Sequence, residues 1–296
     1  MEIIMNEYLY AKLLTEKMPL TSQDIGNKPS ATLNLLARYY RDIGKTNDEI
    51  KQLLNKFLCD CLKNNYEPSK WVSTIDYQVL KSKKYGLKKV DKVEITANEM
   101  NVVNQLKNKS HRKILFTMLV ISKFYNEVSE NNNNWVNLEY KQIFGLANVA
   151  MTIKNQALLV NELYKQNLIS ISRKVGKPNI QVNFVESKSD STKIVLTINR
   201  LWNLGKEYLL YCGENYIRCA KCGDIIKNYR NSNKYCKRCA KYQPIVTKTL
   251  ICCDCGKAFE TISMSNNKRR CDLCQNNYIK KYDKNRKKKF RKSILN

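Results

Sequence analysis

The sequence contains a single histidine and no run of apolar residues long enough to cross a bilayer. His111 lies in KSHRK without a second ligand at metal-binding spacing, and the longest apolar run, ILFTMLVI at 114–121, fits one buried helix. H-E-x-x-H, phosphate-loop and nucleophile-elbow patterns are missing as well. Because no catalytic motif is present, we expect a protein that is not an enzyme.

Acidic residues are few, since 26 Asp and Glu stand against 53 Lys and Arg and leave a formal charge of +27. Two-metal phosphoryl transfer needs clustered carboxylates, which this sequence does not show, although scattered ones can converge in a fold. A field this positive favours a polyanion as partner, either nucleic acid or an anionic membrane surface. The excess is greatest near the end, where residues 201–296 carry 23 basic and 7 acidic side chains.

A secretion signal is not indicated either, because the start, MEIIMNEYLYAK, is acidic where such a signal would be basic. We therefore expect a cytoplasmic protein. Cysteines in the cytosol stay reduced, so the twelve cysteines are expected to include metal ligands rather than disulfides.

The length of 296 residues suits two or three domains, and the helical patterns predict a mainly α, α+β chain. The predicted parts are a helical domain at 1–92, a second domain at 96–200, two small cysteine modules at 212–245 and 250–276, and a basic helix or tail at 277–296.

In the first domain, Ser30 is expected to cap a helix that Gly44 ends, and Thr46 with Glu49 forms a capping box for the next helix. The stretch IGKTN at 43–47 contains the G-K-T of a phosphate loop. That loop also needs a glycine where Tyr39 stands, so we interpret the stretch as a helix end followed by a cap.

The second domain reads as three helices followed by two alternating strands, 168–175 and 180–186, around the turn GKPN. Thr96 and Glu99 form a capping box at its start, and Asn167 is expected to end the last helix in the left-handed region. This order is that of a winged helix-turn-helix, and ELYKQNLISISRK resembles the recognition helix and wing of bacterial winged-helix regulators. The resemblance implies a helix in the DNA major groove and a hairpin on the flanking backbone; other winged helices bind protein, so both partners remain open.

On a helical wheel the last of these helices has one apolar side, which is predicted to face the core: Ile153, Leu159, Val160 and Leu163. The other side is polar and either contacts base edges and phosphates or is simply solvated. The candidate DNA contacts on this helix and on the wing are Lys154, Asn155, Asn161, Lys165, Arg173, Lys174 and Lys177.

Two double C-x-x-C patterns follow, RCAKCGDIIKNYRNSNKYCKRCA at 218–240 and CCDCGKAFETISMSNNKRRCDLC at 252–274. Two such turns place four thiolates around one tetrahedral Zn²⁺, so two zinc ions per chain are predicted. The ligand sets are Cys219, Cys222, Cys236 and Cys239, and Cys252, Cys255, Cys271 and Cys274.

Spacing favours Cys252 over its neighbour Cys253 as the ligand. Short hairpins are expected between the pairs, and a helix from the second pair onward makes each module similar to a zinc-ribbon or treble-clef finger. Pro244 restricts the first module to a stub of helix. Cys59 and Cys61 are predicted to be packing residues, and Cys212 has no partner at ligand spacing.

The last helix is predicted to grip phosphates, with the alternative that it is a frayed, soluble tail. The basic candidates in this part are Arg269, Arg270, Lys280, Lys281, Lys284, Arg286, Lys287, Lys288, Lys289, Arg291 and Lys292.

Taken from residue 96 onward, this order of parts resembles DNA-binding proteins of phages and integrated elements of low-GC Gram-positive bacteria. LNLLARYYRDIGKTNDEIKQLLNKF and KWVSTIDYQVLKSKKYGL, over about 60 residues, resemble the helical module at the end of some phage and plasmid primases. These resemblances imply binding to duplex DNA in transcription control or replication initiation, in association with the nucleoid of a bacterial host cell. A replication accessory or primase-like protein, and an adaptor that binds a host protein such as RNA polymerase, are the alternatives.

Overall fold

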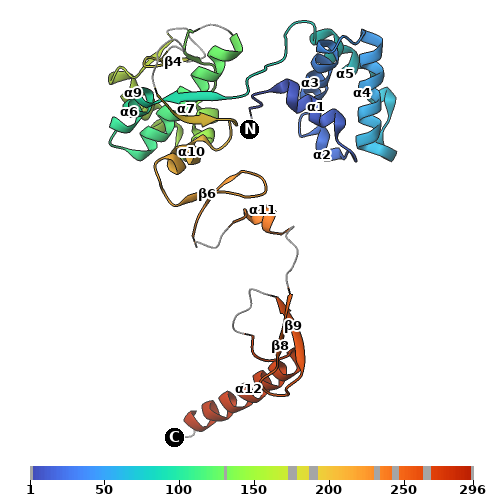
Figure 1. Cartoon of the computed structure of the whole chain (residues 1–296), viewed down its shortest axis with the longest axis vertical. Helices are drawn as coiled ribbons and strands as arrows, with labels where there is room; N and C mark the ends of the chain where they lie inside the picture. Colours follow the sequence, from blue (N-terminus) through green and yellow to red (C-terminus); the bar gives the residue numbers. More distant parts are fainter. Residues whose placement is uncertain are drawn as a thin grey trace. The chain divides into compact units, whose positions relative to one another are not determined.

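The structure is a computed structural model that describes residues 3–129, 132–172, 179–186, 193–229, 234–241, 247–262 and 268–294, with the side chains of the last helix described to residue 287. The chain divides into two units, Met1–Ile217 with Ile225–Asn231, and Arg218–Asp224 with Ser232–Asn296. Both are drawn in Figure 1, and the chain is mainly helical with small sheets. Among the described residues, no helix is both long and apolar enough to pass through a membrane.

The first unit begins with five α-helices and one short 3-10 helix. Their bounds are α1 (Glu7–Glu16), α2 (Ser22–Ile25), α3 (Pro29–Asp42), α4 (Asn47–Leu62), η1 (Lys63–Asn65) and α5 (Pro68–Lys81). Helix α3 packs against α1, α4 and α5 around a core that includes Leu33, Leu36, Ile50, Leu54 and Ile75.

Local sequence signals set the ends of these helices. The Thr46–Glu49 capping box at the start of α4 is confirmed, and Gly44 follows α3 with a φ of 84° in the left-handed region. The prediction that Ser30 caps α3 is wrong. The helix begins at Pro29 with Lys28 as its cap residue, because proline has no N–H to satisfy and its fixed φ suits the first helical position.

A second core lies in the same unit. Its elements are β1 (Val93–Thr96), α6 (Ala97–Gln105), α7 (Lys109–Ser129), β2 (Trp135–Val136), α8 (Tyr140–Leu146), α9 (Ile153–Lys165), β3 (Ile169–Ile171), β4 (Ile180–Val182), β5 (Ile194–Ile198) and α10 (Leu204–Tyr211). The run 114–121 on α7 is buried along its whole length, because α6, α8, α9, α10 and two sheets pack around it.

The sheets of this core differ in part from expectation. Strands β3 and β4 pair antiparallel and β2 joins the other edge of β4, which gives the order β2-β4-β3. Strand β1 pairs with β5, in register from Val93 with Ile198. The described strands are shorter than the predicted 168–175 and 180–186, since residue 172 and residues 183–186 lie outside the ladder. Asn167 has a φ of 56° and ends α9 in the left-handed region, as predicted.

The segments that carry the cysteine pairs contain short strands and two helices. They are β6 (Tyr216–Arg218), β7 (Ile225–Lys227), α11 (Lys237–Ala240), β8 (Thr247–Ile251), β9 (Ala258–Ile262) and α12 (Asp272–Ile294). Strand β6 pairs with β7 and β8 with β9, so each leading C-x-x-C forms the turn of a hairpin. The expected hairpins between the cysteine pairs are therefore wrong for the described residues, where each interval holds only the second strand of this hairpin.

Candidate metal centres

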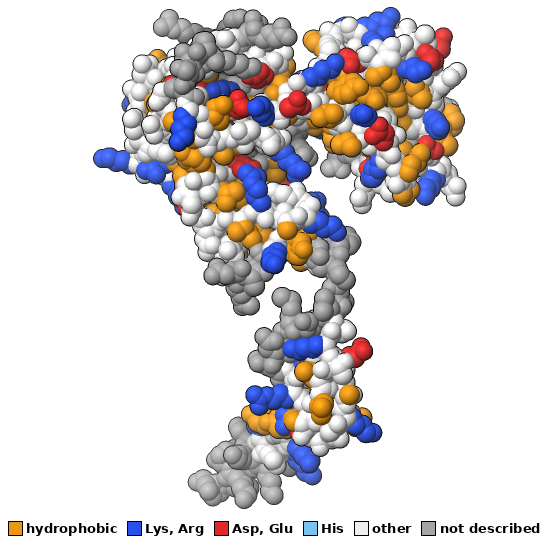
Figure 2. Space-filling model, viewed as in Figure 1, with side chains coloured by type: hydrophobic (Ala, Val, Ile, Leu, Met, Phe, Trp, Pro, Cys, Tyr) orange, Lys and Arg blue, Asp and Glu red, His pale blue; other side chains and the backbone are white. Residues whose placement is uncertain are grey.

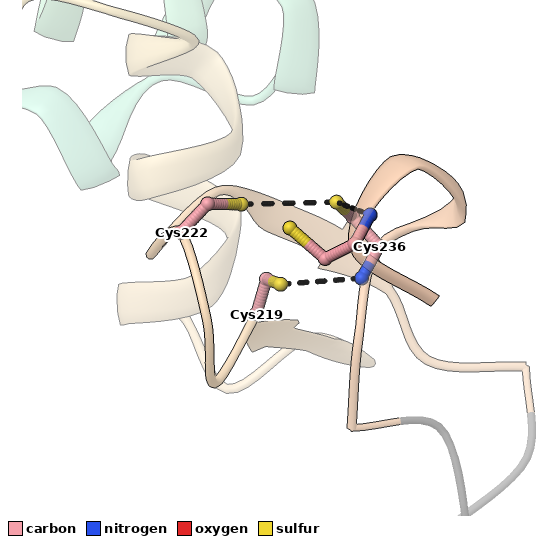
Figure 3. A group of neighbouring side chains, drawn as sticks. Cys219, Cys222 and Cys236 are labelled. Carbon is pink, nitrogen blue, oxygen red and sulfur yellow. Dashed lines mark hydrogen bonds between the residues drawn. The ribbon is translucent and has the colours of Figure 1, made fainter. Parts of the chain in front are cut away.

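The first cysteine group brings four sulfur atoms together. Cys219 and Cys222 come from the turn between β6 and β7, and Cys236 and Cys239 from the start of α11. The sulfurs all lie within 4.8 Å of one another, and those of Cys222 and Cys236 are 3.7 Å apart. Figure 3 shows the labelled thiols of Cys219, Cys222 and Cys236 pointing toward a common centre.

The second group has the same geometry. Its ligands come from the turn between β8 and β9 and from the start of α12, and its sulfurs also lie within 4.8 Å of one another. The sulfurs of Cys255 and Cys271 are 3.8 Å apart. Four sulfurs placed at about 2.3 Å from one ion in a tetrahedron are separated by about 3.8 Å. Both groups therefore fit the shell of a single tetrahedral metal ion.

The same backbone hydrogen bonds build both groups. In each leading turn, the N–H of a glycine donates to the carbonyl of the first cysteine at 2.9 Å, and the glycines have φ values of 73° and 68° (Gly223 and Gly256). The residue after that cysteine donates at 3.0 Å to a carbonyl two positions before the third cysteine (Ala220 to Lys234, Cys253 to Arg269). The two modules thus repeat one local fold, in which glycine is needed because other residues rarely adopt this φ.

Adjacent cysteines have different roles in the second module. Cys252 is 1% exposed and belongs to the metal group, whereas the side chain of Cys253 is exposed and donates to Asp254 at 3.3 Å. The sulfur that joins the group is thus that of Cys252, the residue that the spacing favours as ligand. The two cysteines of α4 differ in burial. Cys61 is buried as expected, but Cys59 is exposed, which contradicts its predicted packing role. The two residues lie on different faces of α4, and only one face reaches the core.

Backbone hydrogen bonds favour the thiolate form of the first ligand in each group. The N–H of Cys236 donates to the sulfur of Cys219 at 3.2 Å and lowers the pKa of that thiol to about 6. The N–H of Cys271 likewise lowers the pKa of Cys252 to about 6. Burial raises the pKa of Cys239 to about 12. A bound cation would favour all four thiolates, because metal binding displaces their protons.

The donor set also limits the chemistry. Four protein sulfurs fill a tetrahedral shell and leave no position for water or substrate, as in structural rather than catalytic sites. The shell of each group therefore suits a metal ion that holds the module together. Two tetra-cysteine groups at this distance indicate two metal ions per chain.

Comparisons of the chain with protein-family models, with curated proteins and with solved structures find no match. The function is therefore argued from the residues of the sites themselves.

Helix α9 presents the polar face expected of it. Lys154, Asn155, Asn161 and Lys165 are exposed, while Leu159, Val160 and Leu163 are buried. The placement of Ile153 in the core is wrong, because this side chain is 84% exposed. It is the first residue of α9, and a helical wheel does not show whether neighbouring elements cover the end of a helix. Arg173, Lys174 and Lys177 of the expected wing lie outside the described residues.

The basic residues near the second metal group are unequal in their contacts. Arg270 donates to Asp254 at 2.7 Å, and its guanidinium lies 4.2 Å from the ring centroid of Tyr278. Arg269 is exposed. The pairing of Arg270 was missed in the sequence, where Asp254 stands sixteen positions away inside the C-x-x-C turn.

Helix α12 continues from the second metal group with exposed basic side chains. Those described as exposed are Lys280, Lys281, Lys284, Arg286 and Lys287, while the side chains of Lys288, Lys289, Arg291 and Lys292 lie outside the described part. Asp283 approaches Arg286 at 3.9 Å. Figure 2 shows basic side chains on this module and over the helical parts of the first unit, with acidic side chains on both.

Proposed function

We propose that the chain is a duplex-DNA-binding protein of phage or mobile-element type that regulates transcription or replication initiation in the cytoplasm. In this proposal 96–200 is a winged helix-turn-helix and each cysteine module is a zinc finger. The observation that carries it is the surface of α9, where Lys154, Asn155 and Asn161 are exposed opposite the buried Leu159 and Leu163. Asn side chains can pair with adenine and Lys side chains with guanine or phosphate in the major groove.

The order of elements supports the same reading. Helices α7, α8 and α9 precede the β3–β4 pair, and β2 joins that pair from before α8. A winged helix-turn-helix has this succession, with its third helix packed on the first two and free on its outer face. The buried residues of α9 face that core, which leaves its polar face for a partner.

Zinc is the metal we propose for both modules. Tetrahedral sites of four thiolates are typical of structural zinc, and iron is the competing ion for such a donor set. The modules are short, and zinc would supply the folding free energy that a small core cannot. A role in folding also fits the closed coordination shell.

The test is selection of bound fragments from a random duplex library at physiological salt, followed by the variant Lys154→Ala with Asn161→Ala. We expect the wild type to enrich a preferred sequence and the variant to lose about 30-fold or more of that preference, because each of the two lost base contacts contributes about 1–3 kcal/mol. Affinity for nonspecific DNA should fall less. The matched control is Gln52→Ala with Lys56→Ala, two exposed residues on α4. A wild type without preference, or a variant that keeps it, would contradict the proposal.

Exposed apolar residues on α9 favour one alternative, an adaptor that binds a host protein such as RNA polymerase. Ile153, Leu158 and Tyr164 are 84%, 57% and 50% exposed. A surface of this kind can bury apolar area against a protein. Capture of a host protein after nuclease treatment, abolished by Ile153→Ser with Leu158→Ser, would favour the adaptor; capture that nuclease abolishes would favour DNA.

A further inference from the structure

A cleft of about 690 Å³ opens in the helical part of the first unit, between α1, the start of α3 and the end of α5. Its size falls within the range of small-molecule sites. None of the residues that line it belongs to the metal groups or to α9. The cleft is therefore separate from the surfaces assigned above.

The cleft is lined by side chains with unpaired polar atoms. In the described part of the chain, five buried side-chain atoms lack a hydrogen-bond partner, and three of them belong to residues that line this cleft. They are the donors Asn34 Nδ2 and Arg38 Nε and the acceptor Gln78 Oε1. Gln78 is only 4% exposed. Buried polar atoms without partners destabilise a fold, so their concentration here indicates a group that pairs with them when bound.

Arg38 itself is held in place. Its Nη1 and Nη2 donate to the two carboxylate oxygens of Glu7 at 2.7 and 3.2 Å, and Nη1 also reaches the carbonyl of Gly86. Its charge is thus already compensated, and only Nε remains without a partner. At this end of the cleft, a ligand would contact the fixed, charge-compensated Arg38–Glu7 pair rather than a free cation.

The other end of the cleft is suited to an anion. Helix α3 has fourteen residues, and its cap residue Lys28 makes no side-chain cap. Pro29 has no N–H, while Ala31 and Thr32 donate back to the carbonyl of Lys28, which leaves the N–H and hydroxyl of Ser30. Lys28 and Lys81 are exposed and form no ion pair within the described residues. Two cations beside a helix N-terminus attract a phosphate group.

We propose that this cleft binds a nucleoside monophosphate. The phosphate lies against Lys28, Ser30 and Lys81, and the base lies deeper, against Asn34 and Gln78. A base edge carries adjacent donors and acceptors, which match the amide donor of Asn34 and the amide acceptor of Gln78. Because these atoms lie just below the surface, the base is admitted by rotation of the two amide side chains. This site goes beyond the DNA-binding proposal and does not depend on it.

The test is calorimetric titration of the full chain with AMP, GMP, CMP and UMP, with the corresponding nucleosides and with inorganic phosphate. We expect micromolar to millimolar binding of at least one monophosphate. Lys28→Gln with Lys81→Gln should weaken its binding about tenfold or more and leave the nucleoside unchanged. Gln78→Met should weaken the binding of both the monophosphate and the nucleoside. Without ligand it should raise the Tm, because it removes an unpaired buried acceptor.

Matched controls are Lys56→Gln and Gln52→Met, which change the same residue types outside the cleft. They should bind the monophosphate as the wild type does. Because every variant and control retains α12, any binding by that helix is the same in all of them and does not produce a difference between cleft variants and controls. Binding of no monophosphate, equal binding of phosphate alone, or cleft variants that match the controls would each overturn the proposal. The lysine variants change exposed residues and should not affect folding. They therefore test the proposed site even if Gln78→Met destabilises the protein.

Discussion

Cys252 and Cys253 are neighbours with the same side chain, and the backbone decides which one can hold a metal. The N–H of Cys252 donates to the carbonyl of Lys257 at 2.9 Å and that of Cys253 to the carbonyl of Arg269 at 3.0 Å. These bonds fix successive residues of the turn, and only the sulfur of Cys252 joins the group. Asp254, held by Arg270, accepts from the other thiol.

This arrangement gives a prediction for single residues. Cys252→Ser should lower the metal content from about two ions to about one per chain, because a three-thiolate shell binds the ion more weakly. Cys253→Ser should retain two. Elemental analysis of the purified variants measures both and identifies the metal.

Loss of metal from Cys253→Ser, or full content in Cys252→Ser, would reassign the ligand. A wild type with one ion or none would remove one or both metal centres. Iron in place of zinc would leave the geometry intact and change only the proposed ion.

Single positions also show where the sequence was sufficient. The grouping of the cysteines could be predicted because C-x-x-C spacing and glycine turns are local features, and the glycines indeed have positive φ. The exposure of Ile153 could not be predicted, because a helical wheel gives the direction of a side chain but not whether neighbouring elements cover it. No pattern in the sequence indicates the unpaired amides of Asn34 and Gln78, since these residues belong to different helices, α3 and α5.

At the scale of elements, short-range signals predicted helices better than strands. Capping boxes at Thr46 and Thr96 marked α4 and α6 correctly. Strand β1 was missed because it has four residues and pairs with β5, about a hundred positions away, and β2 has only two residues. A pairing of that range cannot be inferred from the periodicity of one short segment. The hairpins were misplaced for a different reason: each leading cysteine pair is itself the turn, and the strands lie on both sides of it.

Helix α12 extends for 23 residues from the second metal group, and its described basic side chains are exposed. A helix so rich in one charge is unfavourable alone, and its first turn is fixed where Cys271 accepts from Gln275 at 2.9 Å and Cys274 joins the sulfurs. The metal group thus provides a nucleus for a helix whose described basic side chains are exposed.

The prediction for this element concerns salt. Neutral variants should weaken binding to all DNA sequences and reduce the slope of log affinity against log salt by about 0.9 for each phosphate that the helix no longer neutralises. Titrations at several salt concentrations measure the slope. The variant changes five residues to Gln: Lys280, Lys281, Lys284, Arg286 and Lys287.

The control changes the same number of charges on exposed lysines of the first unit. If α12 grips phosphate, this control lowers affinity less and leaves the slope near that of the wild type. An equal slope in both variants would show general attraction by net charge rather than a binding element. The control positions are Lys56, Lys63, Lys83, Lys84 and Lys107.

At the scale of the whole molecule, two means of stabilisation divide the chain. The two apolar cores of the first unit contain none of the eight metal-group cysteines. The second unit holds both metal groups, short strands and a charged helix. Burial of apolar area stabilises the first unit, whereas we expect the second to depend on bound metal, because small modules bury too little area to fold alone.

Metal removal should therefore unfold one unit and spare the other. In the full chain, treated with a strong zinc chelator under reducing conditions, amide hydrogens of β8, β9 and α12 should exchange at least about tenfold faster. Those of α4 and α7 should keep their protection, since Leu54, Leu58, Phe116 and Leu119 are fully buried in cores that need no metal. Hydrogen exchange measured by mass spectrometry resolves these segments, and added zinc should restore the slow rates. If protection persisted in β8 and β9 after verified metal removal, their fold would rest on interactions other than the thiolate shell; if it vanished from α7 too, the metal would stabilise both units, and the division between apolar and ionic stabilisation would be wrong.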